Sequence, residues 1–376
     1  MKKTKRPLNT WAFLGIYLAI LAVFAGVYAL TKAINTPVPI VGTGSYTPGT
    51  YTGVGAGRNG DITVEVTVNE NTIQAIQIVR HDETPGISDG AIADIPAAIV
   101  ATQSLGVDSV SGATVSSEGI VAAVADAIAK AGGDVEALKN VAIAAGEHSS
   151  KELTADVVVV GGGGAGMTAA VRLAEQGKHV ILFEKASFLG GAISVSGGNQ
   201  VIMGSKLQAE NGVTDDSVES MVADFQANGA NKNNEEILTL FAENVGSATD
   251  WLVEHCGVGF AEGLHQLGEY THNRELAYTG GGAGFAETMR KAVADSGAEV
   301  YLSTKVESLI TDDNGAVVGV KAISTDGNTD YTVSAANVIL ATGGYGNNKK
   351  MLTDEMKSAL YYGPATSTGE GIQMAQ

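Results

Sequence analysis

The apolar and polar positions divide the chain into three stretches of different periodicity. The first is an uninterrupted apolar run from Trp11 to Leu30, which contains no charged side chain. A helix of this length, at about 1.5 Å per residue, matches the ~30 Å hydrocarbon core of a bilayer. Four basic residues precede the run, and such flanks stay in the cytoplasm. Residues 1–34 are therefore predicted to be a single cell-membrane anchor that leaves the rest outside the cytoplasm. A cleaved signal peptide is the alternative, although its apolar core usually spans only ~7–15 residues.

The second stretch, residues 46–134, has the pattern of a small α+β domain. Residues 61–68 alternate apolar and polar side chains with a period of two, and residues 73–79 repeat that pattern after a turn. Residues 117–130 place apolar side chains on one helical face, and Gly132 follows as a stop signal. The Pro/Gly/Thr-rich segment 35–45 and the Ala-rich segment 135–152 are predicted to be linkers, the second partly helical.

The third stretch, residues 153–376, has the pattern of an α/β domain. A short apolar strand at 156–160 leads into a glycine turn, a helix at 167–176 and a second strand at 180–183. This order is a βαβ unit. A later helix at 283–295 and further strands, joined by turns of the Asn-Gly and Asp-Gly type, continue the pattern. The prediction is a Rossmann-like α/β domain.

Composition and charge exclude several classes of protein. The chain has 23 basic and 41 acidic residues and a net charge of −18, so nucleic acid is not expected as a partner, because its binding depends on neutralising phosphates. A lone cysteine, Cys256, excludes an internal disulfide and any metal site built on several cysteines. The six histidines show no ligand-like spacing, and no metal is expected.

The glycine turn of the α/β domain carries a dinucleotide-binding fingerprint. Gly161, Gly163 and Gly166 match G-x-G-x-x-G between a strand and a helix, which suits a pyrophosphate at the helix N-terminus. Glu184 ends the next strand, where a carboxylate grips the hydroxyls of the adenosine ribose. Further glycines at 190–198 and 343–344 favour FAD over NAD, because an isoalloxazine ring needs a passage beyond the ribose.

Longer segments of this domain resemble a known family. GGGGAGMTAAVRLAEQGKHVILFEKASFLGGAISVSGGN, ATGGYGNN and TGEGI look like the FAD domain of soluble fumarate reductases and urocanate reductases, over about residues 153–376. The resemblance implies non-covalent FAD and reduction of the C=C bond of a small α,β-unsaturated carboxylate by hydride from the reduced flavin. The fingerprint and the resemblance together predict these FAD contacts: Gly161, Gly163, Gly164, Ala165, Gly166, Glu184, Lys185, Gly191, Ala192, Gly197, Gly198, Thr342, Gly343, Gly344 and Glu370.

A second flavin is implied in the α+β domain. The segment DSVSGAT at 108–114 is similar to the motif of FMN-binding domains in which a flavin transferase joins FMN to threonine through a phosphodiester, and HDETPG at 81–86 resembles the same domain. By this match, FMN is covalently attached to Thr114. A hydroxyl just before a helix is accessible there, and a helix N-terminus favours a phosphate.

The resemblance supplies no catalytic residue within the chain. In that family the proton-donating arginine and the substrate-binding histidines follow the TGEGI-like segment, so they are expected beyond Gln376, and these 376 residues alone are expected to be inactive. The loop His272-Asn273-Arg274 is one local candidate for a flavin or carboxylate site. The alternatives are a ketosteroid dehydrogenase-like flavoprotein, or a chain that only binds flavin and carries electrons. The acid reduced stays open, as does the membrane electron donor, a quinol or a redox protein.

Overall fold

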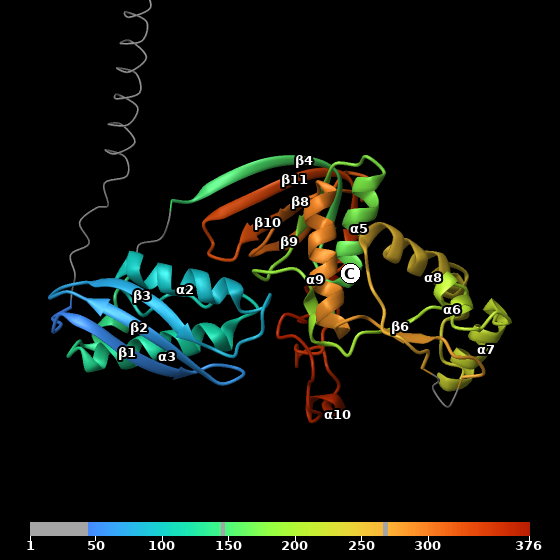
Figure 1. Ribbon diagram of the computed structural model, residues 1–376. Helices are drawn as coiled ribbons and strands as arrows, with labels where there is room; N and C mark the ends of the chain where they lie inside the picture. The colour runs from blue at the N-terminus through green and yellow to red at the C-terminus, as the bar shows by residue number, and fades with distance from the viewer. Residues whose placement is uncertain (1–43, 144–146, 266–269) are drawn as a thin grey trace, which may run out of the picture.

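The computed structural model describes residues 44–143, 147–265 and 270–376, which form an N-terminal and a C-terminal unit (Figure 1). The predicted membrane segment at residues 11–30 lies outside the described residues. Within the described ranges, no helix is both long enough and apolar enough to span a bilayer.

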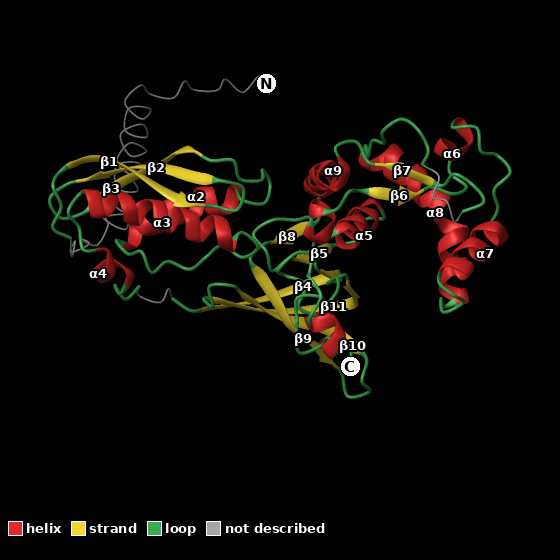
Figure 2. Ribbon diagram, turned by 90° about the horizontal axis from the view of Figure 1, so that it is seen from below, coloured by secondary structure: helices red, strands yellow, loops and turns green. Residues whose placement is uncertain are grey.

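The N-terminal unit, residues 44–143, is an antiparallel sheet of order β1-β2-β3 with helices packed on one face (Figure 2). Alternate residues of β2, such as Ile62 and Val64, are fully buried, and they share one core with Ile120 and Val124 of α3. The sheet lies close to α3, because a Cβ added to Gly53 would be 1.9 Å from the carbonyl oxygen of Ala123. The elements are β1 (Gly49–Ala56), β2 (Asp61–Val68), β3 (Ile73–Arg80), α2 (Asp89–Thr102), α3 (Thr114–Lys130) and α4 (Val135–Lys139).

Two details of this unit differ from the sequence prediction. Helix α3 begins at Thr114, three residues before the predicted start, because the N–H of Ser117 already bonds to the carbonyl of Ala113 at 2.9 Å. Thr114 is therefore the first residue of the helix and does not precede it. Helix α2 was not predicted, since its mixed apolar and small residues have no clear helical period, and Pro96 lies inside it.

The C-terminal unit, residues 147–376, is built on a six-stranded sheet of order β8-β5-β4-β11-β10-β9. The pairs β8–β5, β5–β4 and β4–β11 are parallel, and β10 and β9 add an antiparallel edge. The elements of the sheet and the helices around it are β4 (Ser149–Val160), α5 (Gly164–Glu175), β5 (Val180–Phe183), η1 (Gly191–Val195), α9 (Gly281–Ser296), β8 (Glu299–Tyr301), β9 (Thr304–Thr311), β10 (Val317–Ser324), β11 (Thr329–Leu340), α10 (Asp354–Lys357) and α11 (Glu370–Met374).

Strand β5 has the predicted bounds, whereas β4 is much longer than predicted. It begins at Ser149, inside the range expected as a linker, because its polar first half pairs in parallel with β11 from Thr329 onward. Only Val157–Val160 are buried on both faces, and these were the residues that the apolar pattern could identify. Helices α5 and α9 cover one face of the sheet, where Met167 and Met289 are fully buried.

A smaller subregion extends from the sheet on the side away from the N-terminal unit (Figure 2). Its longest helix, α8, was not predicted, although Asn234 caps its start and Gly257 ends it in a left-handed conformation. Met221 of α7 and Val245 of α8 belong to its separate core. The elements are β6 (Asn199–Val201), α6 (Lys206–Glu210), α7 (Val218–Asn228), α8 (Glu235–Cys256) and β7 (Glu275–Ala277), with β6 and β7 paired antiparallel.

Candidate functional site

The glycine turn between β4 and α5 is shaped by close backbone packing. Gly161 has a φ of +100°, and a Cβ there would lie 2.5 Å from the carbonyl oxygen of Ala341. A Cβ on Gly166 would lie 1.8 Å from the carbonyl oxygen of Gly161, so both glycines are needed for the turn itself. Gly163 precedes α5 and offers no side-chain cap, which leaves the helix N-terminus available for an anion.

Glu184 joins this turn to the end of β5. The N–H of Gly162 donates to Oε2 of the carboxylate at 2.7 Å, and the N–H of Ala186 donates to Oε1, also at 2.7 Å. Burial raises the pKa of Glu184 above its ordinary value, although these two hydrogen bonds oppose the shift. Each carboxylate oxygen has a second lone pair, so the group can still accept from two ribose hydroxyls.

Lys185 and Glu370, both predicted to contact FAD, meet each other. The Nζ of Lys185 lies 3.1 and 3.0 Å from the two carboxylate oxygens of Glu370, and it also donates to the Oγ1 of Thr368 at 2.8 Å. Burial alone would raise the pKa of Glu370, but hydrogen bonds from Thr368 and Lys185 hold it below its ordinary value. The pair connects β5 to the start of α11, which also packs closely on Thr342, since a Cβ on Gly371 would be 1.9 Å from its Oγ1.

The remaining predicted contacts separate into two groups. Gly198 is buried at a φ of +78°, and a Cβ there would be 2.2 Å from the nitrogen of Gly282, so its role in the structure is close packing against α9. Gly191 packs against the glycine turn, because a Cβ added to it would lie 3.2 Å from the Cα of Gly163. Gly164 is half-buried at the start of α5, and the others are exposed on the surface: Ala165, Ala192, Gly197, Gly343 and Gly344.

The exposed glycines leave room for a ligand. An added Cβ on Gly197 or Gly344 would meet no protein atom within 4 Å. Neither residue has the positive φ that favours glycine, so the fold does not explain the absence of a side chain at these positions. Together with the uncapped helix N-terminus and the carboxylate of Glu184, this arrangement fits a dinucleotide with a bulky ring system.

The predicted FMN acceptor lies at an exposed helix start. Thr114 is the first residue of α3 and is exposed, whereas Ser116 and Ser117 point into the domain and are buried. Glu83, from the segment that resembles FMN-binding domains, accepts a hydrogen bond from the Oγ of Ser116, and its other oxygen accepts from the N–H of Asn59 at 2.9 Å. Sequence reasoning noted this segment but did not identify the contact, since it joins residues 33 positions apart.

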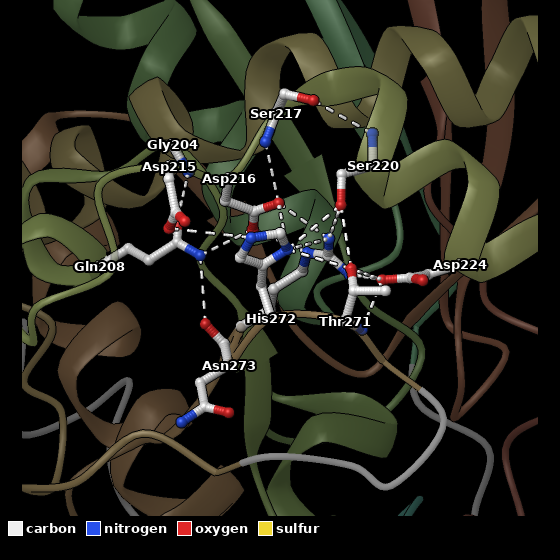
Figure 3. Close-up of polar contacts among 11 residues, drawn as sticks. Gly204, Gln208, Asp215, Asp216, Ser217, Ser220, Asp224, Thr271, His272 and Asn273 are labelled. Carbon is white, nitrogen blue, oxygen red and sulfur yellow. Dashed lines mark hydrogen bonds and ion pairs between the residues drawn. The ribbon is translucent and has the colours of Figure 1, made fainter.

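The residues around His272 form a polar cluster in the smaller subregion (Figure 3), and the contacts of Arg274 with Ser220 and His272 make it part of this cluster. Arg274 is fully buried and makes two hydrogen bonds of 2.8 Å to the two oxygens of Asp216, while its third nitrogen pairs with Asp224. The Nδ1 of His272 lies 3.4 Å from Oδ1 of Asp216. The guanidinium of Arg274 is thus engaged inside the fold, so the idea that it lines a carboxylate site receives no support from its geometry.

The electrostatics of this cluster agree with a structural role. Burial alone would raise the pKa of Asp216 and of Asp224. Hydrogen bonds from Arg274 and Gln208 to the first, and from Thr271 and Arg274 to the second, hold both pKa values below the ordinary value instead. The two aspartates are therefore charged partners of one buried arginine.

Comparison with known proteins identifies both units. Residues 156–376 match the FAD binding domain family, and residues 57–129 match the FMN-binding domain family. Urocanate reductase of Eggerthella lenta is 34% identical over 304 residues, which cover 80% of this chain and 50% of that protein. NADH:acrylate oxidoreductase of Vibrio harveyi is 31% identical, over 82% of this chain and 36% of that protein.

A solved structure agrees with the fold of the C-terminal unit. The open conformation of a flavocytochrome c3 fumarate reductase superposes with a TM-score of 0.56 and 34% sequence identity, over 59% of this chain and 40% of that one. The chain spans half or less of the length of these relatives.

Proposed function

Because this chain belongs to the FAD binding domain family, and joins that domain to an FMN-binding domain as in flavoproteins of the fumarate and urocanate reductase type, we propose that it is the flavin-bearing part of a reductase. Its substrate is the C=C bond of a small α,β-unsaturated carboxylate such as urocanate, fumarate or acrylate. The observation that carries the proposal is the presence of both flavin units in one chain, with the glycine turn and Glu184 in dinucleotide-binding geometry.

The residues of the C-terminal unit would hold FAD without a covalent bond. The N-terminus of α5 and the turn from Gly161 to Gly166 bind the pyrophosphate, and Glu184 accepts hydrogen bonds from the adenosine ribose. The open backbone at Gly197 and Gly344 accommodates the ring system, and the Lys185–Glu370 pair holds the start of α11 beside the end of β5. When bound, FAD supplies a hydride to the substrate carbon, and the chain's own residues orient the cofactor and exclude water from it.

The N-terminal unit would carry FMN on Thr114 through a phosphodiester formed by a separate flavin transferase. The exposure of Thr114 and its place at the first turn of α3 support this, because an enzyme can reach the hydroxyl and the helix N-terminus favours the phosphate. Electrons would enter at FMN from a membrane donor, a quinol or a redox protein, and pass through FAD to the unsaturated acid.

We also propose that the flavin units lie outside the cytoplasm, tethered by residues 1–34. The proposal is supported by the apolar run from Trp11 to Leu30 and the basic residues before it. A covalent bond to FMN would keep an otherwise diffusible cofactor on such a protein. Fractionation and protease access to intact cells test this placement, and a soluble cytoplasmic product would contradict it.

A ketosteroid dehydrogenase-like activity is the competing function. The FMN-binding unit favours the reductase, since a second flavin serves the delivery of electrons to a substrate that is reduced.

The decisive measurement uses the protein expressed from its full reading frame with both flavins. After anaerobic reduction, it should be reoxidised rapidly and saturably by one of urocanate, fumarate or acrylate, and not by the saturated counterpart. Reduction of the oxidised flavin by a 3-ketosteroid, together with no reoxidation of the reduced flavin by any of the acids, would overturn the proposal.

A further inference from the structure

One short segment of the C-terminal unit touches both the N-terminal unit and the dinucleotide turn. Within this segment, residues 186–190, the N–H of Ser187 donates to the carbonyl oxygen of Ser111 at 3.1 Å, and the Oγ of Ser187 donates to the same oxygen at 3.3 Å. Ser111 is three residues before Thr114, and Ser187 is three residues after Glu184. The contact therefore joins the proposed FMN-bearing turn to the proposed ribose-binding strand end.

Glycines of the N-terminal unit allow the close approach of this segment. A Cβ added to Gly112 would be 2.8 Å from the ring of Phe188, and one added to Gly90 would be 3.0 Å from the Oγ of Ser187. Gly90 is the second residue of α2 and has an ordinary helical backbone, so helix geometry does not require a glycine there. Its lack of a side chain suits the contact with Ser187 instead.

Arg290 of α9 adds a second point of contact. Its Nη1 donates to the carbonyl oxygen of Leu189 at 2.9 Å, and a Cβ added to Gly86 would lie 2.7 Å from its Nη2. The guanidinium thus packs against the loop before α2 while it fixes the 186–190 segment from the other side. We call the contacts of residues 86, 90, 111 and 112 with Ser187, Phe188 and Arg290 the interdomain seam.

The opposite side of the segment is tied to the dinucleotide turn. The N–H of Gly190 donates to the carbonyl of Gly162 at 2.8 Å, and a Cβ on Gly162 would be 2.3 Å from the Leu189 side chain. Glu184 also accepts from the N–H of both Gly162 and Ala186. The segment is therefore a rigid spacer, only a few residues thick, between the two proposed flavin sites.

We infer that the interdomain seam is the docking surface that holds the FMN-bearing turn against the FAD site, and that Ser187 is a positioning residue for electron transfer between the flavins. The inference rests on the proposed function. In the net reaction, FMNH2 and FAD give FMN and FADH2, so two electrons and two protons leave the first flavin and reach the second. Docking fixes the separation of the two flavins, whereas a free tether would leave it to diffusion.

A disulfide trap tests the docking without any flavin. In the chain with Cys256→Ala, we combine Gly90→Cys with Ser187→Cys. The ideal Cβ of residue 90 lies 3.2 Å from the Cβ of Ser187, so a shift of a few tenths of an ångström brings the pair into the range of about 3.5–4.5 Å that a disulfide needs. The control pair is Ala97→Cys with Ser187→Cys, since Ala97 is an exposed residue of the same helix. We expect intact-mass analysis to show near-complete bridging in the first pair and little in the control. Equal yields would overturn the seam.

Electron transfer is then measured in the protein carrying both flavins, with FAD exchanged for a 2-thio analogue whose absorption is red-shifted. Chemical reduction is followed by stopped flow, and Thr114→Ala gives the rate that does not depend on FMN. Because the disulfide takes over the docking contact that Ser187 makes with Ser111, the bridged variant should keep the wild-type rate of analogue reduction. A wedge variant, Gly90→Arg, should lower the FMN-dependent rate at least about 10-fold, and Ala97→Arg should not.

The outcomes separate the seam from the proposed function. If the disulfide forms but abolishes FMN-dependent reduction, the docked arrangement is not the one that transfers electrons, and the inference is wrong. If Thr114→Ala reduces the analogue as fast as the wild type while the disulfide still forms, the electron route through FMN is wrong and only the docking remains.

Discussion

The backbone N–H of Gly162 and the carboxylate of Glu184 are joined by a hydrogen bond of 2.7 Å that links the turn after β4 to the end of β5. The other carboxylate oxygen accepts from Ala186 at the same distance. The side chain thus satisfies one backbone group of the turn and one of the segment after β5, and it does so at the proposed ribose-binding position. Removing it should affect both the turn and the cofactor.

Replacing Glu184 by Gln tests that double role. The amide has one acceptor oxygen, so one of the two N–H groups loses its partner at a cost of about 1–3 kcal/mol in the free energy of unfolding. Loss of the charged acceptor should also weaken FAD binding by about 10- to 100-fold. Denaturant unfolding and FAD titration measure the two effects, with the exposed Glu152→Gln as control. Unchanged FAD affinity would remove Glu184 from the site.

The same carboxylate predicts a dependence of FAD affinity on pH. Because burial raises the pKa of Glu184 in the free protein, its protonation begins at a higher pH than for an ordinary glutamate. The ionised form is the better acceptor for ribose hydroxyls, so FAD affinity should be full above this raised pKa and should fall as the pH decreases through it. Titrations from neutral pH down to the ordinary glutamate value of 4.5 would show the decrease in the wild type and a flatter profile in Glu184→Gln. Identical profiles would contradict the assignment.

Gly197 and Gly344 separate cofactor binding from folding. An added side chain meets no protein atom within 4 Å at either position, so Gly197→Val and Gly344→Val should change the free energy of unfolding by less than about 1 kcal/mol. If FAD occupies that space, both should lose at least about 10-fold in FAD affinity. Gly166→Ala is the opposite case, because its Cβ would overlap the backbone of Gly161 and should disrupt the fold. Normal FAD binding by both valine variants would place the cofactor elsewhere.

Thr114→Ala should abolish covalent FMN when the chain is co-expressed with a flavin transferase, because the alanine has no hydroxyl to form the phosphodiester. Ser109→Ala is the matched control, since Ser109 is an exposed hydroxyl of the same segment. Intact mass would show the FMN adduct in the wild type and in the control only. An adduct of the same mass in Thr114→Ala would place the modification on another residue.

The sequence predicted best the parts that are fixed by local pattern. Residues 180–183 form a strand with the expected bounds because all four are apolar and buried on both faces. The polar first half of β4 gave no such signal, since it is a strand only through its pairing with β11, about 180 residues away. Helix α8 did carry signals, an Asn cap before it and a glycine after it, but its buried residues are mixed with many polar ones.

The same limit applies to the candidate site. The fingerprint could be found from spacing alone, as could Glu184 at the end of the next strand. Two other contacts could not be found from spacing, because they join residues far apart in the chain. These are the contacts of Lys185 with Glu370 and of Ser187 with Ser111. His272 and Arg274 looked like a polar loop near a flavin, because sequence does not show that Asp216 and Asp224 surround the arginine.

Arg274→Met tests whether that arginine serves the fold. The substitution leaves Asp216 and Asp224 without their shared cation, and breaking a buried pair from one side costs about 3–5 kcal/mol in the free energy of unfolding. Arg172→Met is the control, because the pair of Arg172 with Glu175 is at the surface and is worth about 0–1 kcal/mol. Denaturant unfolding of both variants gives the comparison.

The difference between the wild type and Arg274→Met should also depend on pH in a defined direction. The pKa values of Asp216 and Asp224 are lowered in the folded wild type, so the stability that their ionised forms contribute is present above the ordinary value of 3.8 and is lost as the pH falls through the lowered values. The destabilisation caused by Arg274→Met should therefore be largest near neutral pH. It should shrink as the pH falls toward and through the ordinary value of 3.8, because burial without the arginine raises the pKa of the aspartates and they become protonated in the variant first. Wild-type stability in Arg274→Met at neutral pH, combined with a loss of substrate-dependent flavin reoxidation in the full-length enzyme, would instead return this arginine to the list of candidate substrate-binding residues.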